Sequence, residues 1–277
     1  MEQNTLQYFA DYLKESEHSP ATIEKYLRDL RHFLTFAGAD TLPDKQALLL
    51  WREELLRRGY CVSSINSMLA AVNRFFVSLG RSDCCVRPLR QQRRIFRDPG
   101  LELTREEYLR LLSAARSRKR RRLLLVMETI CSTGIRVSEL PYITVQAVLQ
   151  GSASVRCKGK LRTILLPHPL CSRLQEWMRQ EKIREGCLFR TRSGKPLDRS
   201  NIWREMKSLC QEAGVEERKV FPHNLRHLFA RTFYRLEKDL SKLADVLGHS
   251  SLETTRIYIM ESTQAHERLL NRMCLLL

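Results

Sequence analysis

Residues Phe221–Tyr258 begin Phe221-Pro222-His223-Asn224-Leu225-Arg226-His227 and, after Leu247-Gly248-His249-Ser250, end on Tyr258. Positions i, i+3 and i+4 share one face of a helix, so His223, Arg226 and His227 can present hydrogen-bonding groups to one spot. Pro222 suits the first turn of that helix, which puts His223 near its positive end, where anions bind. This spacing predicts a helix with an anion site at its start.

The end of this stretch predicts a second helix. Gly248 is typical of a helix end, and Ser250 and Glu253 have the spacing of a capping box, which places Tyr258 about two turns further on. The alternative is a pair of core helices in which the histidines and the tyrosine are structural. A matching piece upstream, Thr133–Leu140, favours a site, because Arg136 follows the apolar helix predicted at Leu123–Ile130.

Two arginines fit a phosphate well. Paired guanidinium groups match the non-bridging oxygens of a phosphate better than lysines do, so Arg136 and Arg226 together would form a clamp. The charge agrees, because the 277 residues carry a net charge of +17. Residues 99–277 hold 33 basic and 19 acidic side chains, whereas residues 1–98 hold 15 and 12. This excess indicates a polyanion, and DNA is the polyanion that it favours.

Composition excludes several other classes. Hydrophobic residues make up 43% of the chain, and no segment has the ~20 apolar residues that span a bilayer. The start of the chain lacks the pattern of a signal peptide, which predicts a cytoplasmic protein. Nine cysteines without C-x-x-C spacing predict reduced thiols rather than disulfides or zinc. We therefore expect no metal and no cofactor.

Residues 1–80 have the apolar period of a small helical bundle. Ser19 and Pro20 start one helix, which Gly38 ends, and further helices are predicted at about Asp44–Arg58 and from Ser63 or Ser64 to Gly80. From Leu103 a second region begins with a capping box, Thr104 to Glu107. The predicted fold is mainly α with a small antiparallel β-sheet, in two domains.

The small sheet is predicted after the Arg136 motif. Residues 153–157 and 161–167 have the pattern of strands, and Lys158-Gly159-Lys160 forms the turn between them. Two further helices are expected, at about 168–181 and 199–211.

The motifs Thr133–Leu140, His-x-x-Arg-His from His223, Leu247-Gly248-His249-Ser250 and the later tyrosine resemble those of tyrosine recombinases, of the phage-integrase and Xer-like type. The order is the same, and the resemblance covers nearly the whole chain. It implies a catalytic set with two supporting residues, Glu139 and His227. That set is Arg136, Lys158, His223, Arg226, His249 and the nucleophile Tyr258.

The hairpin is where the sequence departs from the family pattern. In the family such a lysine reaches the scissile phosphate, and Lys158 is the position that corresponds. The turn departs from the commoner Gly-Lys-Gly-x-Lys pattern, because Cys157 replaces the first glycine. Lys160 therefore stays open as the alternative, or as a DNA contact.

The resemblance also divides the chain into three parts. Residues 1–85 correspond to a helical, SAM-like core-binding domain for DNA, 86–102 to a basic linker, and 103–277 to a catalytic domain with a C-terminal tail helix. Five linker arginines repel one another unless an anion is near, so we expect them to lie along phosphates. They are Arg87, Arg90, Arg93, Arg94 and Arg97.

Attack of a tyrosine on a DNA phosphodiester requires three contributions. Arg136 and Arg226 can neutralise the transition state, and His249 and His227 can add donors or orient their neighbours. His223, with an ordinary pKa near ~6.5, can accept the proton of a phenol whose pKa is near ~10. Lys158 would protonate the leaving 5′ oxygen, and Glu139 would hold Arg136. One ester replaces another, so neither ATP nor a divalent metal is required.

The resemblance implies a site-specific DNA recombinase or integrase that forms a 3′-phosphotyrosyl intermediate. Its expected partner is double-stranded DNA with inverted-repeat core sites, bound by a homotetramer on two sites, with a monomer when free. An apolar stripe from Leu269 to Leu277 must pack on something, and the resemblance implies that it docks into a neighbouring protomer, the alternative being that it folds back on its own catalytic domain. An accessory DNA-bending or directionality factor is a further candidate partner. Two alternatives stay open: a type IB topoisomerase-like relaxing enzyme, and a non-catalytic DNA-binding regulator.

Overall fold

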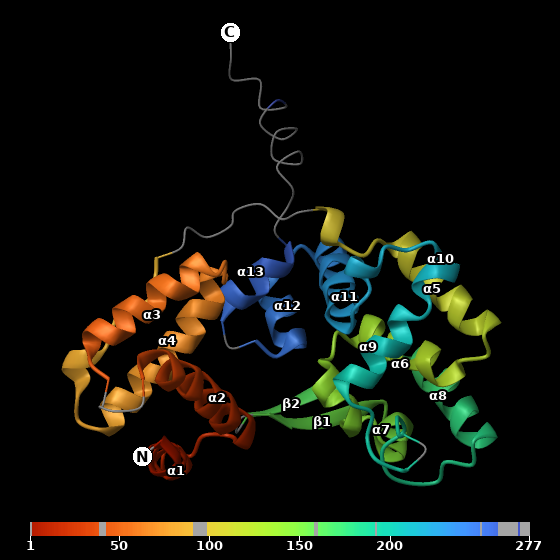
Figure 1. Ribbon diagram of the computed structural model, residues 1–277. Helices are drawn as coiled ribbons and strands as arrows, with labels where there is room; N and C mark the ends of the chain where they lie inside the picture. Colours follow the sequence, from red (N-terminus) through yellow and green to blue (C-terminus); the bar gives the residue numbers. More distant parts are fainter. Residues whose placement is uncertain are drawn as a thin grey trace. The chain divides into compact units, whose positions relative to one another are not determined.

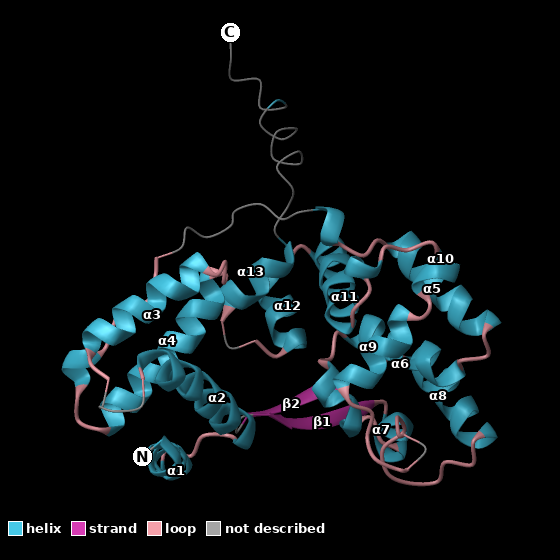
Figure 2. Ribbon diagram, in the orientation of Figure 1, coloured by secondary structure: helices cyan, strands magenta, loops and turns pink. Residues whose placement is uncertain are grey.

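The computed structural model describes residues 2–38, 43–90, 99–157, 160–191, 193–249, 251–259 and 271. The chain divides into two compact units between Arg93 and Arg94 (Figure 1). Helices make up most of both units, and unit 2 also contains a two-stranded antiparallel sheet (Figure 2). The predicted class, mainly α with a small antiparallel sheet in two domains, is confirmed.

In the described part of unit 1, four α-helices enclose an aromatic core: α1 (Glu2–Glu15), α2 (Pro20–Ala37), α3 (Lys45–Arg57) and α4 (Val62–Ser78). The 3-10 helix η1 (Ser82–Cys84) follows them. Ser19 caps α2 by accepting a hydrogen bond from the backbone N–H of Thr22, with Pro20 in the first turn as predicted. The rings of Phe9 and Phe75 meet edge to face with centroids 5.5 Å apart. Aromatic burial of this kind stabilises the bundle.

Helix α4 begins earlier than the predicted Ser63 or Ser64. Cys61 is its N-cap, and the backbone N–H groups of Ser64 and Ile65 donate to the Cys61 carbonyl. The two serine hydroxyls lie 3.3 and 3.0 Å from Cys61 Sγ. Ser63 and Ser64, where the helix was predicted to start, therefore lie inside the first turn of α4.

The start of the predicted linker packs on α4. Val86 is buried, and its backbone pairs with the side chain of Asn73, while the Leu89 backbone pairs with Asn66. Arg87 and Arg90 are exposed. Arg93, Arg94 and Arg97 lie outside the described residues.

Helix α6 is the central helix of unit 2, and the residues of its middle turns are almost all buried. The elements of this unit before the sheet are η2 (Pro99–Leu101), α5 (Arg105–Ser117), α6 (Arg121–Thr133), η3 (Val137–Tyr142) and α7 (Val145–Gln150). After the sheet come α8 (His168–Gln180), α9 (Arg199–Lys207), α10 (Cys210–Ala213), η4 (Glu217–Lys219), α11 (Pro222–Glu237), α12 (Leu240–Leu247) and α13 (Leu252–Ile259). The capping box of α5 forms as predicted, with Thr104 and Glu107 bonding each other's backbone N–H.

The helix predicted at 199–211 is divided into α9 and α10. At the division, the Leu209 N–H donates to the Met206 carbonyl, and the Ser208 hydroxyl donates to the Glu205 carbonyl. This tighter i→i−3 bonding ends the regular turn after Lys207.

The sheet is a hairpin of β1 (Ser152–Cys157) and β2 (Lys160–Leu165). Its register pairs Ser152 with Leu165 and Cys157 with Lys160. Ile164 is buried whereas Leu161 and Leu165 are exposed, as the period of two in a strand requires. Arg162 therefore lies on the same face of the strand as Ile164, which is the face that packs on the rest of unit 2.

Candidate active site

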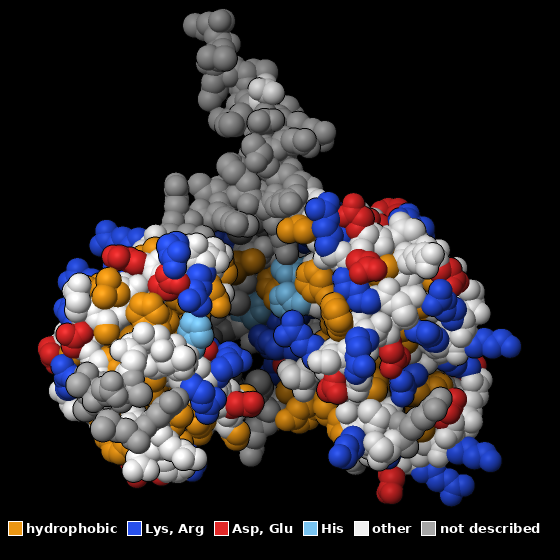
Figure 3. Space-filling view, in the orientation of Figure 1, with side chains coloured by type: hydrophobic (Ala, Val, Ile, Leu, Met, Phe, Trp, Pro, Cys, Tyr) orange, Lys and Arg blue, Asp and Glu red, His pale blue; other side chains and the backbone are white. Residues whose placement is uncertain are grey.

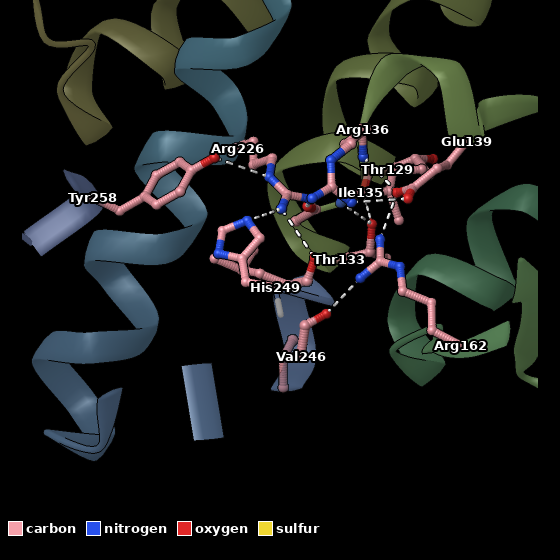
Figure 4. Close-up of polar contacts among 12 residues, drawn as sticks. Thr129, Thr133, Ile135, Arg136, Glu139, Arg162, Arg226, Val246, His249 and Tyr258 are labelled. Carbon is pink, nitrogen blue, oxygen red and sulfur yellow. Dashed lines mark hydrogen bonds and ion pairs between the residues drawn. The ribbon is translucent and has the colours of Figure 1, made fainter. Parts of the chain in front are cut away.

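Arg226 is the centre of the site and is 1% exposed on α11. Its Nη1 donates to the Gly134 carbonyl, and its Nη2 lies 3.0 Å from the Leu247 carbonyl oxygen and 2.8 Å from His249 Nε2. Its Nε donates to the Tyr258 hydroxyl at 3.3 Å (Figure 4). Burial lowers the pKa of Arg226, yet a guanidinium keeps its charge in proteins. Arg226 is thus a buried cation oriented by four acceptors.

Gly134 is required where α6 ends against α11. It adopts a φ of +66°, and a Cβ there would lie 2.4 Å from the Phe229 ring. Its carbonyl accepts from Arg226, so a side chain at this position would have to move either the Phe229 ring or the backbone that anchors the arginine.

Arg136 lies at the start of η3 and is held by Glu139. Glu139 is 1% exposed, accepts the Arg136 backbone N–H at 2.8 Å and forms an ion pair with Arg136 Nη1 at 3.2 Å. Its other partner is Arg162 of β2, which also donates to the Val246 carbonyl at 2.9 Å. Glu139 therefore connects Arg136 to the hairpin, and through Arg162 to the end of α12 (Figure 4).

A pocket opens where three helices begin. Its lining includes Arg136 and Ser138 at the start of η3, Asp198 and Arg199 at the start of α9, and His223 and Arg226 of α11. The Asp198 carboxylate caps α9 by accepting from the Asn201 backbone N–H. Helix N-termini favour anions, and three arginines add permanent positive charge. This pocket can hold a phosphate.

Tyr258 of α13 is 5% exposed, and its hydroxyl lies beside Arg226 and His223. Its hydroxyl lies 3.5 Å from His223 Nε2, in addition to the bond from Arg226. The His227 ring packs against the Tyr258 ring at 4.4 Å between centroids. His227, 6% exposed, supports the tyrosine by ring packing.

His249 is neutral at neutral pH. Burial, together with the neighbouring charges of Arg226, Arg136 and Arg162, lowers the pKa of His249 to about 4. A guanidinium only donates hydrogen bonds, so His249 Nε2 accepts from Arg226. The imidazole proton is consequently on Nδ1, which lies 2.8 Å from the Thr255 hydroxyl.

The structure connects four members of the expected catalytic set by direct contacts, namely His223, Arg226, His249 and Tyr258. The fifth, Arg136, lines the same pocket as His223 and Arg226 and is held by Glu139, and His227 packs on Tyr258. Lys158 lies outside the described residues, and for Lys160 only the backbone, at the start of β2, is described. Sequence reasoning missed Arg162 and Thr255. The available signals were the inward register of Arg162 on its strand and the i, i+3 spacing between Thr255 and Tyr258.

Other predicted features can be compared with the described part of the chain. There, no group of three or more His, Cys, Asp or Glu side chains is placed to bind a metal ion. Within the same ranges, no helix is both long and apolar enough to cross a bilayer. On the face seen in Figure 3, Lys and Arg side chains are spread over both units with Asp and Glu among them.

Comparison with known proteins identifies the class. Residues 102–265 match the phage integrase family, and residues 6–82 match the phage integrase N-terminal SAM-like domain. Tyrosine recombinase XerA of Pyrococcus furiosus is 31% identical over 266 residues, covering 91% of this chain and 88% of the relative. Tyrosine recombinase XerC of Roseiflexus castenholzii is 30% identical, covering 91% and 86%. The chain belongs to the phage integrase family and is a tyrosine-type site-specific recombinase.

Solved structures agree on the fold. A lambda integrase tetramer bound to a Holliday junction has a TM-score of 0.73 at 17% identity, covering 92% of this chain and 76% of that one. XerH bound to its difH substrate has a TM-score of 0.67 at 21% identity, with 91% and 82% covered. The curated relatives, which are tyrosine recombinases, do not favour a relaxing enzyme or a non-catalytic regulator.

Proposed function

We propose that this recombinase cuts and rejoins duplex DNA through a 3′-phosphotyrosyl link to Tyr258, without ATP or a divalent metal. One observation supports this most directly. The Tyr258 hydroxyl lies within reach of both Arg226 and His223, inside one unit. Nucleophile, cation and base are therefore supplied by a single chain.

The first step follows from this geometry. The Tyr258 hydroxyl donates its proton to His223 Nε2, and its oxygen attacks the phosphorus while the bond to the 5′ oxygen breaks. Arg226 stabilises the developing phenolate through its Nε–H, and Arg136 and Arg226 together neutralise the pentacoordinate phosphate. A free 5′ hydroxyl from another strand then attacks the link and releases Tyr258.

The leaving oxygen needs a proton. We assign this role to Lys158 by the family resemblance, with Lys160 as the alternative lysine of the same turn. Lys158→Ala should slow cleavage far more than Lys160→Ala. A substrate with a 5′-bridging sulfur needs no such proton and should rescue the first variant only, because a thiolate leaves unprotonated.

The DNA-binding arrangement extends beyond the pocket. Residues 1–85 would bind one face of the DNA, the linker 86–102 would follow phosphates through its five arginines, and residues 103–277 would carry the chemistry. We propose inverted-repeat core sites, a monomer when free, and a homotetramer on two sites in the cytoplasm, with an accessory bending or directionality factor. The tail helix of each protomer would dock into its neighbour.

The experiment is covalent capture. The protein is incubated with sheared DNA of its source organism in excess EDTA, denatured, and assayed for a DNA adduct on Tyr258 by mass spectrometry. The intact chain and Tyr234→Phe should form the adduct, because Tyr234 belongs to the same apolar cluster as Tyr258 but is not the nucleophile. Tyr258→Phe should form none. An adduct in that variant, or a strict need for magnesium, would contradict the proposal.

A further inference from the structure

Thr255 is a fully buried polar residue that the motifs do not include. It lies on α13 with 0% exposure, and its hydroxyl contacts His249 Nδ1 at 2.8 Å. The adjacent Thr254 is exposed. A buried hydroxyl without a partner is costly, so the His249 contact matters to both groups.

This contact, together with the bond from Arg226, determines which imidazole nitrogen carries the proton. Arg226 Nη2 occupies the lone pair of His249 Nε2, and Thr255 receives the proton of Nδ1. Each bond favours the same tautomer, because neutral imidazole has one donor and one acceptor. Burial keeps the ring neutral, assisted by charged or titratable groups from three places: Arg226 and His223 of α11, Arg136 at the start of η3, and Arg162 of β2.

The hydrogen bonds of Thr255, His249, Arg226 and Tyr258 form a network that begins and ends on α13. Tyr258 follows Thr255 by three residues, so both side chains lie on the same face of this helix. From Thr255 the hydrogen bonds run through His249 to Arg226, and Arg226 bonds back to Tyr258. If α13 moved away, the network would lose Thr255 and Tyr258 together.

We propose that Thr255 is a positioning residue that ties the tautomer of His249 to the docking of the helix that carries Tyr258. While α13 is docked, His249 Nε2 is an acceptor and orients Arg226. When α13 leaves, Tyr258 leaves with it, and the His249 ring loses the acceptor of its Nδ1–H. The link between this release and the removal of the nucleophile from the site rests on the proposed function, whereas the tautomer itself does not.

The test is ¹⁵N NMR of the histidine-labelled full chain without DNA, with the His249 signals assigned through His249→Gln. In the intact chain Nδ1 should be protonated and Nε2 bare at pH 7. Thr255→Val keeps the β-branched shape but removes the hydroxyl. In that variant the Nδ1–H loses its acceptor, so the fraction of the ring in the Nδ1-protonated tautomer should fall. The titration midpoint should also move further below its ordinary value, because the imidazolium depends on that acceptor more than the neutral ring does.

Two further variants separate the contact from packing. Thr255→Ser keeps the hydroxyl and should behave as the intact chain, although it loses a methyl group. Thr254→Val makes the same substitution at the exposed neighbour and should also change nothing. An unchanged tautomer and midpoint in Thr255→Val, or a Thr255→Ser signal like that of Thr255→Val, would overturn the proposal. Because no DNA is present, a failure of Tyr258 as nucleophile cannot produce either result.

Discussion

The two units bury different kinds of side chains. Among the residues that the structure describes, unit 1 buries one polar side chain, Asp29, beside an aromatic core. Over the same described ranges, unit 2 buries eight: Glu128, Thr129, Thr133, Glu139, Asn224, Arg226, His227 and Thr255. Burying polar and charged groups costs free energy unless partners compensate, so a set of this size needs an explanation other than stability.

Part of the difference is structural and part is functional. Thr129 and Thr133 donate to carbonyls one turn earlier in α6, which satisfies them locally. Glu139, Arg226 and Thr255 instead bond across separate elements and converge on the site. Changes in the unit 1 core should therefore affect stability, whereas changes in this set should affect chemistry more than stability.

The largest expected effect is a loss of stability in unit 1. Phe75→Ala removes a ring that is 0% exposed and should cost about 3 to 5 kcal/mol through lost burial and a cavity. Hydrogen exchange should show lost protection in α1–α4 with α6 and α11 unchanged. Val77→Ala, at a side chain 40% exposed on the same helix, is the control and should change little. Lost protection in α6 would contradict separate cores.

The next largest expected effect is that of Arg226→Lys on the rate of DNA cleavage. Lysine keeps the charge but cannot reach the Gly134 and Leu247 carbonyls, His249 and Tyr258 from one nitrogen. Adduct formation on captured DNA should slow by roughly 10²–10³-fold in single-turnover assays, the range for loss of one transition-state donor. Arg235→Lys, exposed on the same helix, is the matched control. A rate within a few-fold of the intact chain would mean that only the charge of Arg226 matters.

The sequence predicted local features better than their connections. The cap at Ser19, the capping box at Thr104 and the stop at Gly248 depend on a few adjacent residues, and all three form. The spacing of His223, Arg226 and His227 also correctly predicted that the three side chains share one face of one helix. Short-range physics decides these features, and it can be read from neighbouring residues.

Connections between distant segments could not be predicted in this way. The anchors of Arg226 are backbone carbonyls of Gly134 and Leu247, which carry no sequence signal of their own. Arg162 reaches Glu139 only because the hairpin packs beside η3. The predicted tail docking and the capping role of Ser250 fall outside the described residues, and both stay predictions.

The pH dependence of stability in unit 2 is a third, smaller effect. The folded chain holds the pKa of His249 at about 4, below its ordinary value near 6.5. Between these values the unfolded chain binds a proton that the folded chain does not, so stability falls as pH decreases from 6.5 to 4. The loss should stay below about 3 kcal/mol, because solvent screens a half-buried ring.

Denaturant unfolding of the intact chain and His249→Gln measures this loss. The glutamine variant should have a shallower slope of stability against pH in this window, because it cannot titrate. His168→Gln, at an exposed histidine that begins α8, should keep the slope of the intact chain. Equal slopes in all three proteins would show that His249 does not titrate below its ordinary range.

The smallest expected effect is on the stability of unit 2, and it concerns a glutamate at the third helical position, which occurs in two helices. Glu107 accepts the Thr104 N–H at 2.8 Å and serves stability, whereas Glu139 accepts the Arg136 N–H at the same distance and also holds its guanidinium. Thr104→Ala removes only the hydroxyl that caps Glu107 N–H, so it should cost about 1 kcal/mol of unit 2 stability. Adduct formation below the unfolding temperature should stay unchanged, and Thr104→Ser should restore stability. A fall in cleavage rate without a fall in stability would mean that the start of α5, like η3, positions the active site.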